Sequence, residues 1–214
     1  MRQFWNSEIT EASWNGIKDL AKEIEFVLIG GWAVYLYSNL QKSRDIDIII
    51  GYEELSVLSR KHNLVKNERL KKYEIKLPKY DIDIYLPDYS PLPIPPKDIM
   101  KEFTLRHKGF TLPTQEVLLC LKIGAAIDRK GSFKGDKDAI DILGLLFYSD
   151  INKEKLRNLI ARYDLRGYLD FLISVLSSFN LRNLLYLNID EHEFSKLKRY
   201  HIETLREIRT VQGS

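Results

Sequence analysis

The sequence is poor in cysteine and has no long apolar run. Its 214 residues include one cysteine, Cys120, so no internal disulfide framework can form. Cys120 lies in an apolar run, where a buried and unreactive thiol is expected. No stretch approaches the roughly 20 apolar residues of a membrane helix, and the N-terminus lacks a signal-peptide core. We therefore predict a cytoplasmic protein that does not enter a membrane.

The chain also lacks a strong charge bias. Lys and Arg number 33 against 30 Asp and Glu, which gives a net charge of +3. This mild basicity permits a nucleic-acid partner but does not indicate one. The four histidines show no spacing typical of metal ligands. With 44% hydrophobic and 29% charged residues, the composition is that of a globular protein able to bury a core.

Hydrophobic periodicity and turn residues predict an alternating first half. Ser7 is a plausible N-cap for the first helix, and Pro78-Lys79 is a turn signal between two alternating runs. The expected elements are a helix over 7–24, a strand over 26–29, a helix over 32–40, a strand over 44–50, a helix over 53–61, a hairpin of 68–77 with 80–86, a proline-rich loop over 87–96 and a hairpin of 102–106 with 110–112.

From Thr114 onward the pattern becomes helical. Thr114 can cap a helix that runs to about Arg129, and the glycine-containing stretch 130–135 should break it. A second helix carries residues 139–146, and further helices cover 156–160, 169–176 and 194–208. We predict an α/β fold with a mixed β-sheet and flanking helices (residues 1–113), followed by a C-terminal helical bundle (residues 114–214).

Two glycines and two aspartates form the most informative pattern. Gly30-Gly31 follows an apolar strand and opens a helix, so backbone N–H groups there can bind an anion. Asp45 and Asp47 share one face of the next strand, about 7 Å apart, and can hold divalent cations between them. The plainer alternative is a pair of aspartates on a solvent face. The apolar run that follows favours a central strand, in which two aspartates need a compensating partner.

The aspartate pattern recurs in the segment Asp81-Ile82-Asp83. If the two strands are neighbours, a third carboxylate reaches the same site. Asp83 is the preferred candidate because an apolar run follows it, although Asp81 remains open. Three carboxylates are typical ligands of two Mg²⁺ ions in phosphoryl or nucleotidyl transfer, and oxygen ligands favour Mg²⁺ over zinc.

The ordered set of Gly30-Gly31, Asp45-x-Asp47 and a later strand aspartate resembles the signature of the polymerase-beta-like nucleotidyltransferase superfamily. This resemblance covers about residues 26–86. A second block, formed by 112–122, Arg129 and 137–142, is similar to the helical signature of the abortive-infection type nucleotidyltransferases, which include toxins of toxin–antitoxin pairs. The family more often has Arg where Lys137 stands.

The resemblance implies a metal-dependent enzyme that moves NMP from an NTP, such as ATP, to an acceptor hydroxyl. The acceptor could be RNA or a tRNA 3′ end, a protein or a small molecule such as an aminoglycoside, and an antitoxin-like partner is possible. The implied metal ligands are Asp45, Asp47 and Asp83, which with Lys122 are also the catalytic residues. The implied nucleotide-binding residues are Gly30, Gly31, Ser43, Arg44, Lys122 and Asp138, while Asp141 is expected to be structural.

Two other functions stay open at the level of the sequence. Glu74-Ile75-Lys76 after the first aspartates loosely resembles the metal-binding motif of restriction-like nucleases. A non-catalytic module that binds a nucleotide or the partner of a toxin–antitoxin-like pair is the second alternative.

Overall fold

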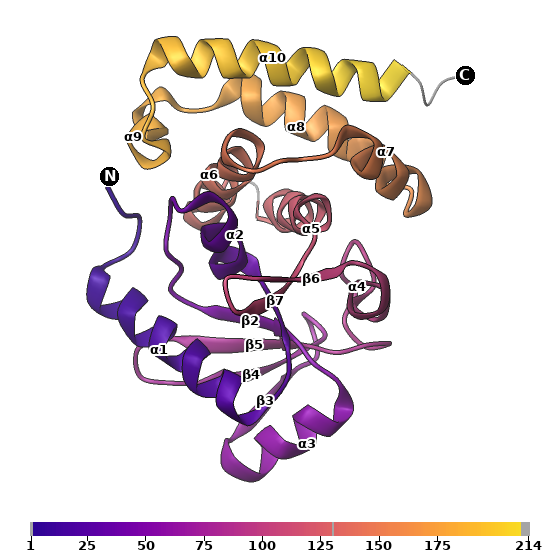
Figure 1. The fold of residues 1–214 in the computed structure, drawn as a ribbon. Helices are drawn as coiled ribbons and strands as arrows, with labels where there is room; N and C mark the ends of the chain where they lie inside the picture. Colours follow the sequence, from indigo (N-terminus) through magenta and orange to yellow (C-terminus); the bar gives the residue numbers. More distant parts are fainter. Residues whose placement is uncertain (1, 130, 211–214) are drawn as a thin grey trace.

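The computed structural model describes residues 2–129 and 131–210. Within these residues, seven strands form one mixed sheet in the order β3-β4-β5-β2-β1-β7-β6 (Figure 1). The strands are β1 Val27–Ile29, β2 Ile46–Ile49, β3 Leu64–Asn67, β4 Lys72–Lys76, β5 Asp81–Tyr85, β6 Thr104–His107 and β7 Phe110–Pro113. The predicted α/β fold class is confirmed.

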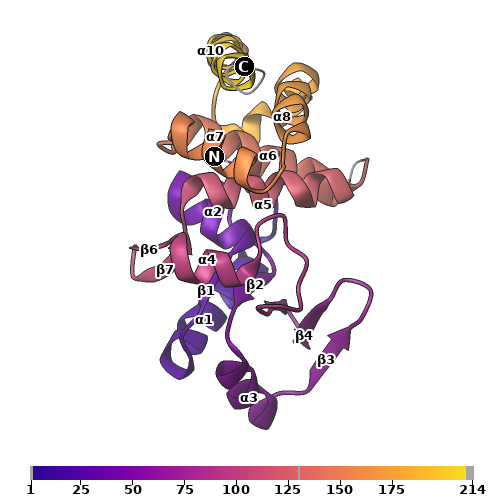
Figure 2. The ribbon, with the colours of Figure 1, turned by 90° about the vertical axis from the view of Figure 1, so that its right-hand side faces the viewer.

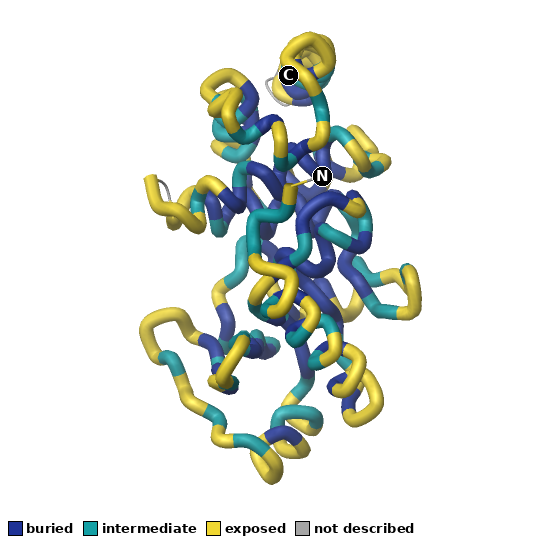
Figure 3. Tube along the Cα trace, turned by 90° about the vertical axis from the view of Figure 1, so that its left-hand side faces the viewer, coloured by how far each residue is buried: buried dark blue, intermediate teal, exposed yellow. Residues whose placement is uncertain are grey.

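Helices, joined by loops and turns, surround this sheet and form the C-terminal part of the described chain. They are α1 Ser7–Glu23, α2 Gly30–Ser38, α3 Tyr52–Lys61, α4 Pro96–Glu102, α5 Gln115–Asp128, α6 Phe133–Tyr148, α7 Lys153–Arg162, α8 Gly167–Ser178, α9 Leu184–Leu187 and α10 Glu191–Thr210, with a 3₁₀ turn at Leu181–Asn183. Figures 1 and 2 show α2, α5 and α6 between the sheet and an outer layer of α7, α8 and α10. Figure 3 shows that the buried segments run through the middle of this arrangement.

The register of the central strands positions the site. β2 runs antiparallel to β1, which pairs Asp47 with Ile29, and parallel to β5, which pairs Asp47 with Asp83. The glycine turn follows Ile29 directly, so it lies beside the start of β2. Ile46 and Ile48 are fully buried on the opposite face from the aspartates, so the apolar face fixes which way the carboxylates point.

One continuous set of buried side chains spans the sheet and the C-terminal helices. Val34 of α2, Leu118 of α5 and Leu143 of α6 all belong to it. The chain changes from strands to helices after Pro113, but the division into residues 1–113 and 114–214 stays a prediction. In the part of the chain that the structure describes, no helix is long and apolar enough to cross a membrane.

Several predicted boundaries in the first half are wrong for local reasons. The first helix is capped by Asn6 rather than Ser7, because the Asn6 side chain accepts the N–H of Glu8 at 2.8 Å. The expected strand over 68–77 starts only at Lys72, as β4, because residues 68–71 form a turn in which Lys71 takes a positive φ of 49°. This turn joins β4 to β3, a strand that was not predicted. β2 begins at Ile46, which leaves Arg44 and Asp45 just before the strand.

Two helix starts also differ from the prediction. α4 was not expected; proline at its first position has the φ that a helix needs, so the proline-rich loop ends in a helix. α6 begins at Phe133, where Ser132 accepts the N–H of Gly135, so Gly135 lies inside the helix rather than in the break. Lys130, part of the expected break, lies outside the described residues.

Candidate functional site

The turn between β1 and α2 requires both of its glycines. Gly30 has a φ of 66°, and a Cβ there would collide with the Asp47 carboxylate. A Cβ on Gly31 would lie 2.6 Å from the Ser43 hydroxyl oxygen. Ile29 precedes the helix and supplies no side-chain cap, and Gly31 lines a cavity. The start of α2 is thus an uncapped helix N-terminus that can bind an anion.

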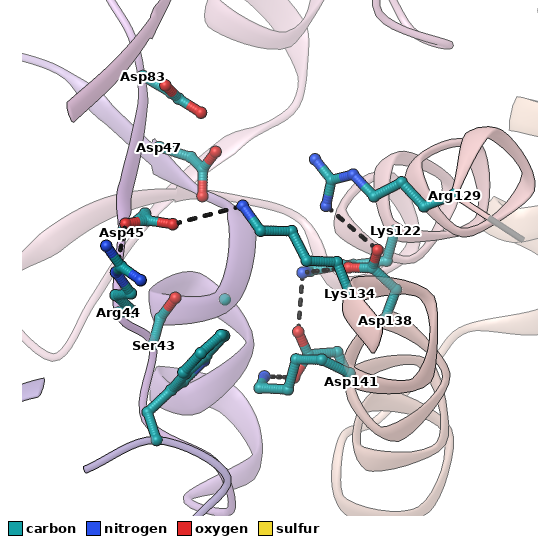
Figure 4. A pocket seen from close by; sticks show the side chains of 13 residues that line it. Ser43, Arg44, Asp45, Asp47, Asp83, Lys122, Arg129, Lys134, Asp138 and Asp141 are labelled. Atoms are coloured by element: carbon teal, nitrogen blue, oxygen red, sulfur yellow. Dashed lines mark hydrogen bonds and ion pairs between the residues drawn. The ribbon is translucent and has the colours of Figure 1, made fainter. Parts of the chain in front are cut away.

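Three predicted carboxylates lie on this same cavity. Asp45, Asp47 and Asp83 all line it, and Figure 4 shows them along one side, with the cations of α5 and α6 opposite. Asp81 is not among the lining residues, since its carboxylate binds Lys76 at 2.9 Å. Asp83 is therefore the better placed of the two candidates for the third carboxylate.

The paired carboxylates are electrostatically unfavourable as they stand. Burial, together with the charge of Asp83, raises the pKa of Asp47 to about 6. Burial also raises the pKa of Asp83, although the Lys72 ammonium lies 2.5 Å from one of its oxygens and opposes that rise. Two acidic groups that resist ionisation beside each other provide a place for added positive charge.

Buried charges of α5 and α6 form the opposite wall. Lys122 Nζ lies 3.1 Å from Asp138 Oδ1 and 2.7 Å from Asp141 Oδ2. Burial disfavours the charge of Lys122, but Asp141 and Asp138 more than compensate and raise its pKa. Lys137 also binds Asp141, and Arg129 binds Asp138 at 3.2 Å. Asp138 and Asp141 therefore hold Lys122 and Arg129 in place on the cavity wall (Figure 4).

Of the remaining predicted residues, Ser43 and Arg44 line the cavity, whereas Gly30 is not among its lining residues. Ser43 is buried there, and Arg44 Nε lies 3.5 Å from Asp45 Oδ1. The structure adds residues that the sequence did not single out. Lys134 extends from α6 until its Nζ is 3.8 Å from Asp45 Oδ2, and Trp5 lines the cavity from the N-terminal segment.

Trp5 could not be found from local sequence patterns. Its segment is held by Gln41, which accepts the N–H of Phe4 at 2.8 Å and donates to the Arg2 carbonyl at 2.9 Å. These partners are 37 and 39 residues apart in the chain. Lys134 gave no signal either, because one lysine at a helix start is common on solvated surfaces.

The three carboxylates of Asp45, Asp47 and Asp83 have the chemistry that a magnesium site needs, but their side chains are not yet arranged around one point. The three carboxylates offer oxygen donors alone, which hard cations such as Mg²⁺ prefer. Among the residues that the structure describes, no group of three acidic, histidine or cysteine side chains lies close enough together to coordinate one metal ion. Asp83 is turned toward Lys72 and Asp45 toward Arg44 and Lys134, so ion binding would require these side chains to exchange partners.

Comparison with solved structures places this arrangement in a known fold. An H. pylori protein provisionally assigned as a nucleotidyltransferase superposes with a TM-score of 0.52, at 16% identity and over 96% of each chain. The chain has a nucleotidyltransferase-like fold. No protein-family model matches the sequence, and no match was found among curated proteins.

Two further structures show weaker overall similarity to this chain. An antigenic nucleotidyltransferase-like protein from Paracoccidioides brasiliensis has a TM-score of 0.44 and 19% identity, over 81% of this chain and 94% of that one. JHP933 from Helicobacter pylori has a TM-score of 0.49 and 15% identity, over 96% of this chain and 93% of that one. Neither is close enough to support a functional argument.

The nuclease-like motif has a different role in this fold. Glu74 is buried on β4, where Lys72 lies 3.0 Å and Lys76 3.1 Å from its carboxylate oxygens, and it is not among the residues that line the cavity. These contacts lower the pKa of Glu74 to about 2, against the opposing effect of burial. Glu74 is a partner of neighbouring lysines, and the nuclease alternative gains no support.

Proposed function

We propose that this protein is a magnesium-dependent nucleotidyltransferase, which moves NMP from an NTP to an acceptor hydroxyl and releases pyrophosphate. One observation carries the proposal. Three carboxylates from the β2 and β5 region and an uncapped helix N-terminus face a single cavity in a nucleotidyltransferase-like fold. Nucleotidyl transfer needs both an anion-binding site for the phosphates and an acidic cluster for the metal ions.

The NTP phosphates would bind at the N-terminus of α2, over Gly30 and Gly31. Ser43 is close enough to Gly31 to contact the same phosphates, and Arg44 borders the cavity beside them. Lys122 and Arg129 would neutralise charge from the opposite wall. Because Asp138 and Asp141 already orient Lys122, little reorganisation is needed when the nucleotide arrives.

Asp45, Asp47 and Asp83 would hold Mg²⁺, which supplies charge neutralisation for the phosphates and lowers the pKa of an acceptor hydroxyl. In the transfer, the acceptor oxygen forms a bond to the α-phosphorus. The bond from that phosphorus to the bridging oxygen of the β-phosphate breaks, and pyrophosphate leaves. Asp83, whose pKa is raised, would accept the proton of the hydroxyl.

Transfer of label from radioactive NTPs tests the proposal. The protein is incubated with Mg²⁺, each α-labelled NTP in turn, and pools of RNA, protein or aminoglycosides as acceptors. Incorporation that disappears with EDTA supports the proposal. Binding of NTP without any incorporation would favour the non-catalytic alternative. Failure to bind NTP in the presence of Mg²⁺ would refute the proposal and the nucleotide-binding form of that alternative.

A matched pair of variants links the activity to the site. Asp83→Asn removes a carboxylate that lines the cavity, whereas Asp81→Asn changes the same residue type two positions away, outside the cavity. We expect Asp83→Asn to reduce kcat by 100-fold or more, on the order of a lost general base. Asp81→Asn should stay within about threefold of the wild type. Equal effects of the two changes would contradict the assigned roles.

Three further features of the proposal come from the sequence alone. ATP as a usable nucleotide and an antitoxin-like partner are implied by the resemblance, and the cytoplasmic location was predicted from the composition. Transfer assays with each of the four NTPs address the first of these features directly.

A further inference from the structure

The charged side chains of β4 take no part in the proposed function, although they lie against the third carboxylate. Lys72, Glu74 and Lys76 alternate along β4 and therefore share one face of the strand. The antiparallel register places Glu74 directly opposite Asp83 on β5. Two carboxylates in opposite positions repel each other. The pair therefore needs a cation, and Lys72 supplies it.

The ammonium of Lys72 is shared between these two carboxylates. Its Nζ lies 2.5 Å from Asp83 Oδ2 and 3.0 Å from Glu74 Oε1. The side chains of Lys72 and Glu74 are only 9% and 10% exposed, so water screens these contacts little. An ammonium carries three donors and can serve both carboxylates at once. Lys72 is therefore the counter-ion of Asp83 and of Glu74.

The two partners of Lys72 differ in their surroundings. The Asn67 amide donates to Glu74 Oε1 at 3.0 Å, and Lys76 Nζ lies 3.1 Å from Glu74 Oε2. Each oxygen of Glu74 thus has a donor other than Lys72. Asp83 lines the carboxylate cavity, whereas Glu74 is not among its lining residues. Glu74 is therefore a fixed acceptor for Lys72 beside the site, and Asp83 is the carboxylate that faces it.

We infer that Lys72 occupies Asp83 in place of a divalent cation and moves onto Glu74 when that cation binds. The inference rests on the metal site of the proposed function and adds to it, since it assigns a positioning role to Lys72 and Glu74. The ammonium keeps one of its two present partners, so a short movement is enough. No proton is transferred, and no buried charge is left without a partner. Together the two residues set how tightly the carboxylates hold the ion.

The two residues should change the affinity for metal in opposite directions. Lys72 competes with the ion for Asp83 and repels it, so Lys72→Met should tighten binding, by about tenfold for a unit charge a few ångströms away. Glu74→Gln leaves Lys72 with Asp83 as its carboxylate partner, so it should weaken binding about fivefold. In the double variant the effect of Glu74→Gln should fall below about twofold, because the lysine through which it acts is gone.

Titration with Mn²⁺ tests the inference without any turnover. Carboxylates bind Mn²⁺ as they bind Mg²⁺, and the free ion is measured by electron paramagnetic resonance. Dissociation constants are compared for the wild type, the two single variants and the double variant. Lys76→Met is the matched control, because Lys76 lies on the same face and binds the same Glu74 but pairs with Asp81 instead of Asp83. It should leave the dissociation constant within about twofold.

A purely structural role for Lys72 would give a different result. Loss of a buried counter-ion destabilises the protein, but a packing defect does not tighten Mn²⁺ binding. If Lys72→Met does not fold, Glu74→Gln and Asp81→Asn decide the question, since each removes one carboxylate and only Glu74 contacts Lys72. Glu74→Gln should then weaken binding at least about threefold more than Asp81→Asn. Equal effects of these two variants would contradict the inference.

The outcomes separate this inference from the proposed function. Unchanged or weaker binding by Lys72→Met, or the same loss from Glu74→Gln with and without Lys72, would overturn the inference. The proposed function would then stand, provided that the wild type binds Mn²⁺. If the wild type binds no Mn²⁺, both fail. A crystal structure with Mn²⁺ gives the direct check: Lys72 should stay within ion-pair distance of Glu74 but no longer of Asp83.

Discussion

Asp47 should lower the stability of the metal-free protein at neutral pH, so Asp47→Asn should raise it. The folded state raises the pKa of this carboxyl from its ordinary value of 3.8 to about 6, through burial and the nearby charge of Asp83. Below pH 3.8 the group is protonated in both states and contributes nothing. Between these two values the unfolded chain releases a proton that the folded chain keeps, so the free energy of unfolding falls as pH rises.

The size of this effect follows from the pKa difference. A rise of about 2 pKa units corresponds to roughly 3 kcal/mol of lost stability above pH 6. Asp47 is partly exposed, so solvent screening reduces this figure, and we expect Asp47→Asn to gain about 1–3 kcal/mol at pH 8. For a chain of this length, that corresponds to a rise in Tm of several degrees.

Thermal unfolding in EDTA at pH 4 and pH 8 measures the gain. The gain should be largest at pH 8 and shrink toward pH 4, whereas Mg²⁺ at pH 8 should stabilise the wild type but not Asp47→Asn. Asp45→Asn serves as a control because the Asp45 carboxylate makes loose ion pairs, at 3.5 and 3.8 Å, and accepts the N–H of Asp81 at 3.4 Å, a bond that the amide oxygen of asparagine can also accept. Its stability should change by less than about 0.5 kcal/mol. If Asp47→Asn loses stability at pH 8, or gains equally at both pH values, the electrostatic argument is refuted.

Two further substitutions test the packing of the site by thermal or urea unfolding. Gly30→Ala should cost about 2 kcal/mol or more, because alanine at a φ of 66° is strained and its Cβ collides with the β2 carboxylate; Gly167→Ala, with open space around the glycine, should be near neutral. Lys122→Met should cost about 3–5 kcal/mol by leaving two buried aspartates without their shared cation. The exposed Lys196→Met should change stability by less than about 0.5 kcal/mol, and equal losses for the two lysine variants would contradict this reading.

The sequence predicted the parts of the site that follow from strand and turn rules. Side-chain alternation predicted one face for Asp45 and Asp47, and both line the cavity, although Asp45 lies just before β2. The glycine pair marked the strand-to-helix turn, because this feature depends on neighbours within a few residues. The role of Asp83 depends on the pairing of β2 with β5. From the sequence, this pairing had to be assumed and could not be predicted. The parallel register of Asp47 with Asp83 shows that this condition is met.

Other parts of the site depend on contacts between distant segments. Trp5 reaches the cavity because Gln41 binds the N-terminal segment, and no periodicity encodes such a contact. Ser132 caps α6 and moves its start ahead of the glycine that was expected to break it. The cavity between α5 and the proline-rich loop depends on the close approach of Gly124 to Pro93, two residues that lie 31 positions apart.

The sheet order connects these observations to function. A strand order of β1-β2-β5-β4 brings the start of α2, two strands with acidic residues and the Lys72 ammonium into one line, with neighbouring strands about 4.8 Å apart. Charge along this line changes from the positive end of α2 through the paired carboxylates to Lys72. In the proposed function, the NTP phosphates bind at the positive end of α2, and the acidic middle is then the place where added cations are needed. The repulsion between the carboxylates, through which Asp47 lowers the stability of the metal-free protein, therefore favours the binding of cations.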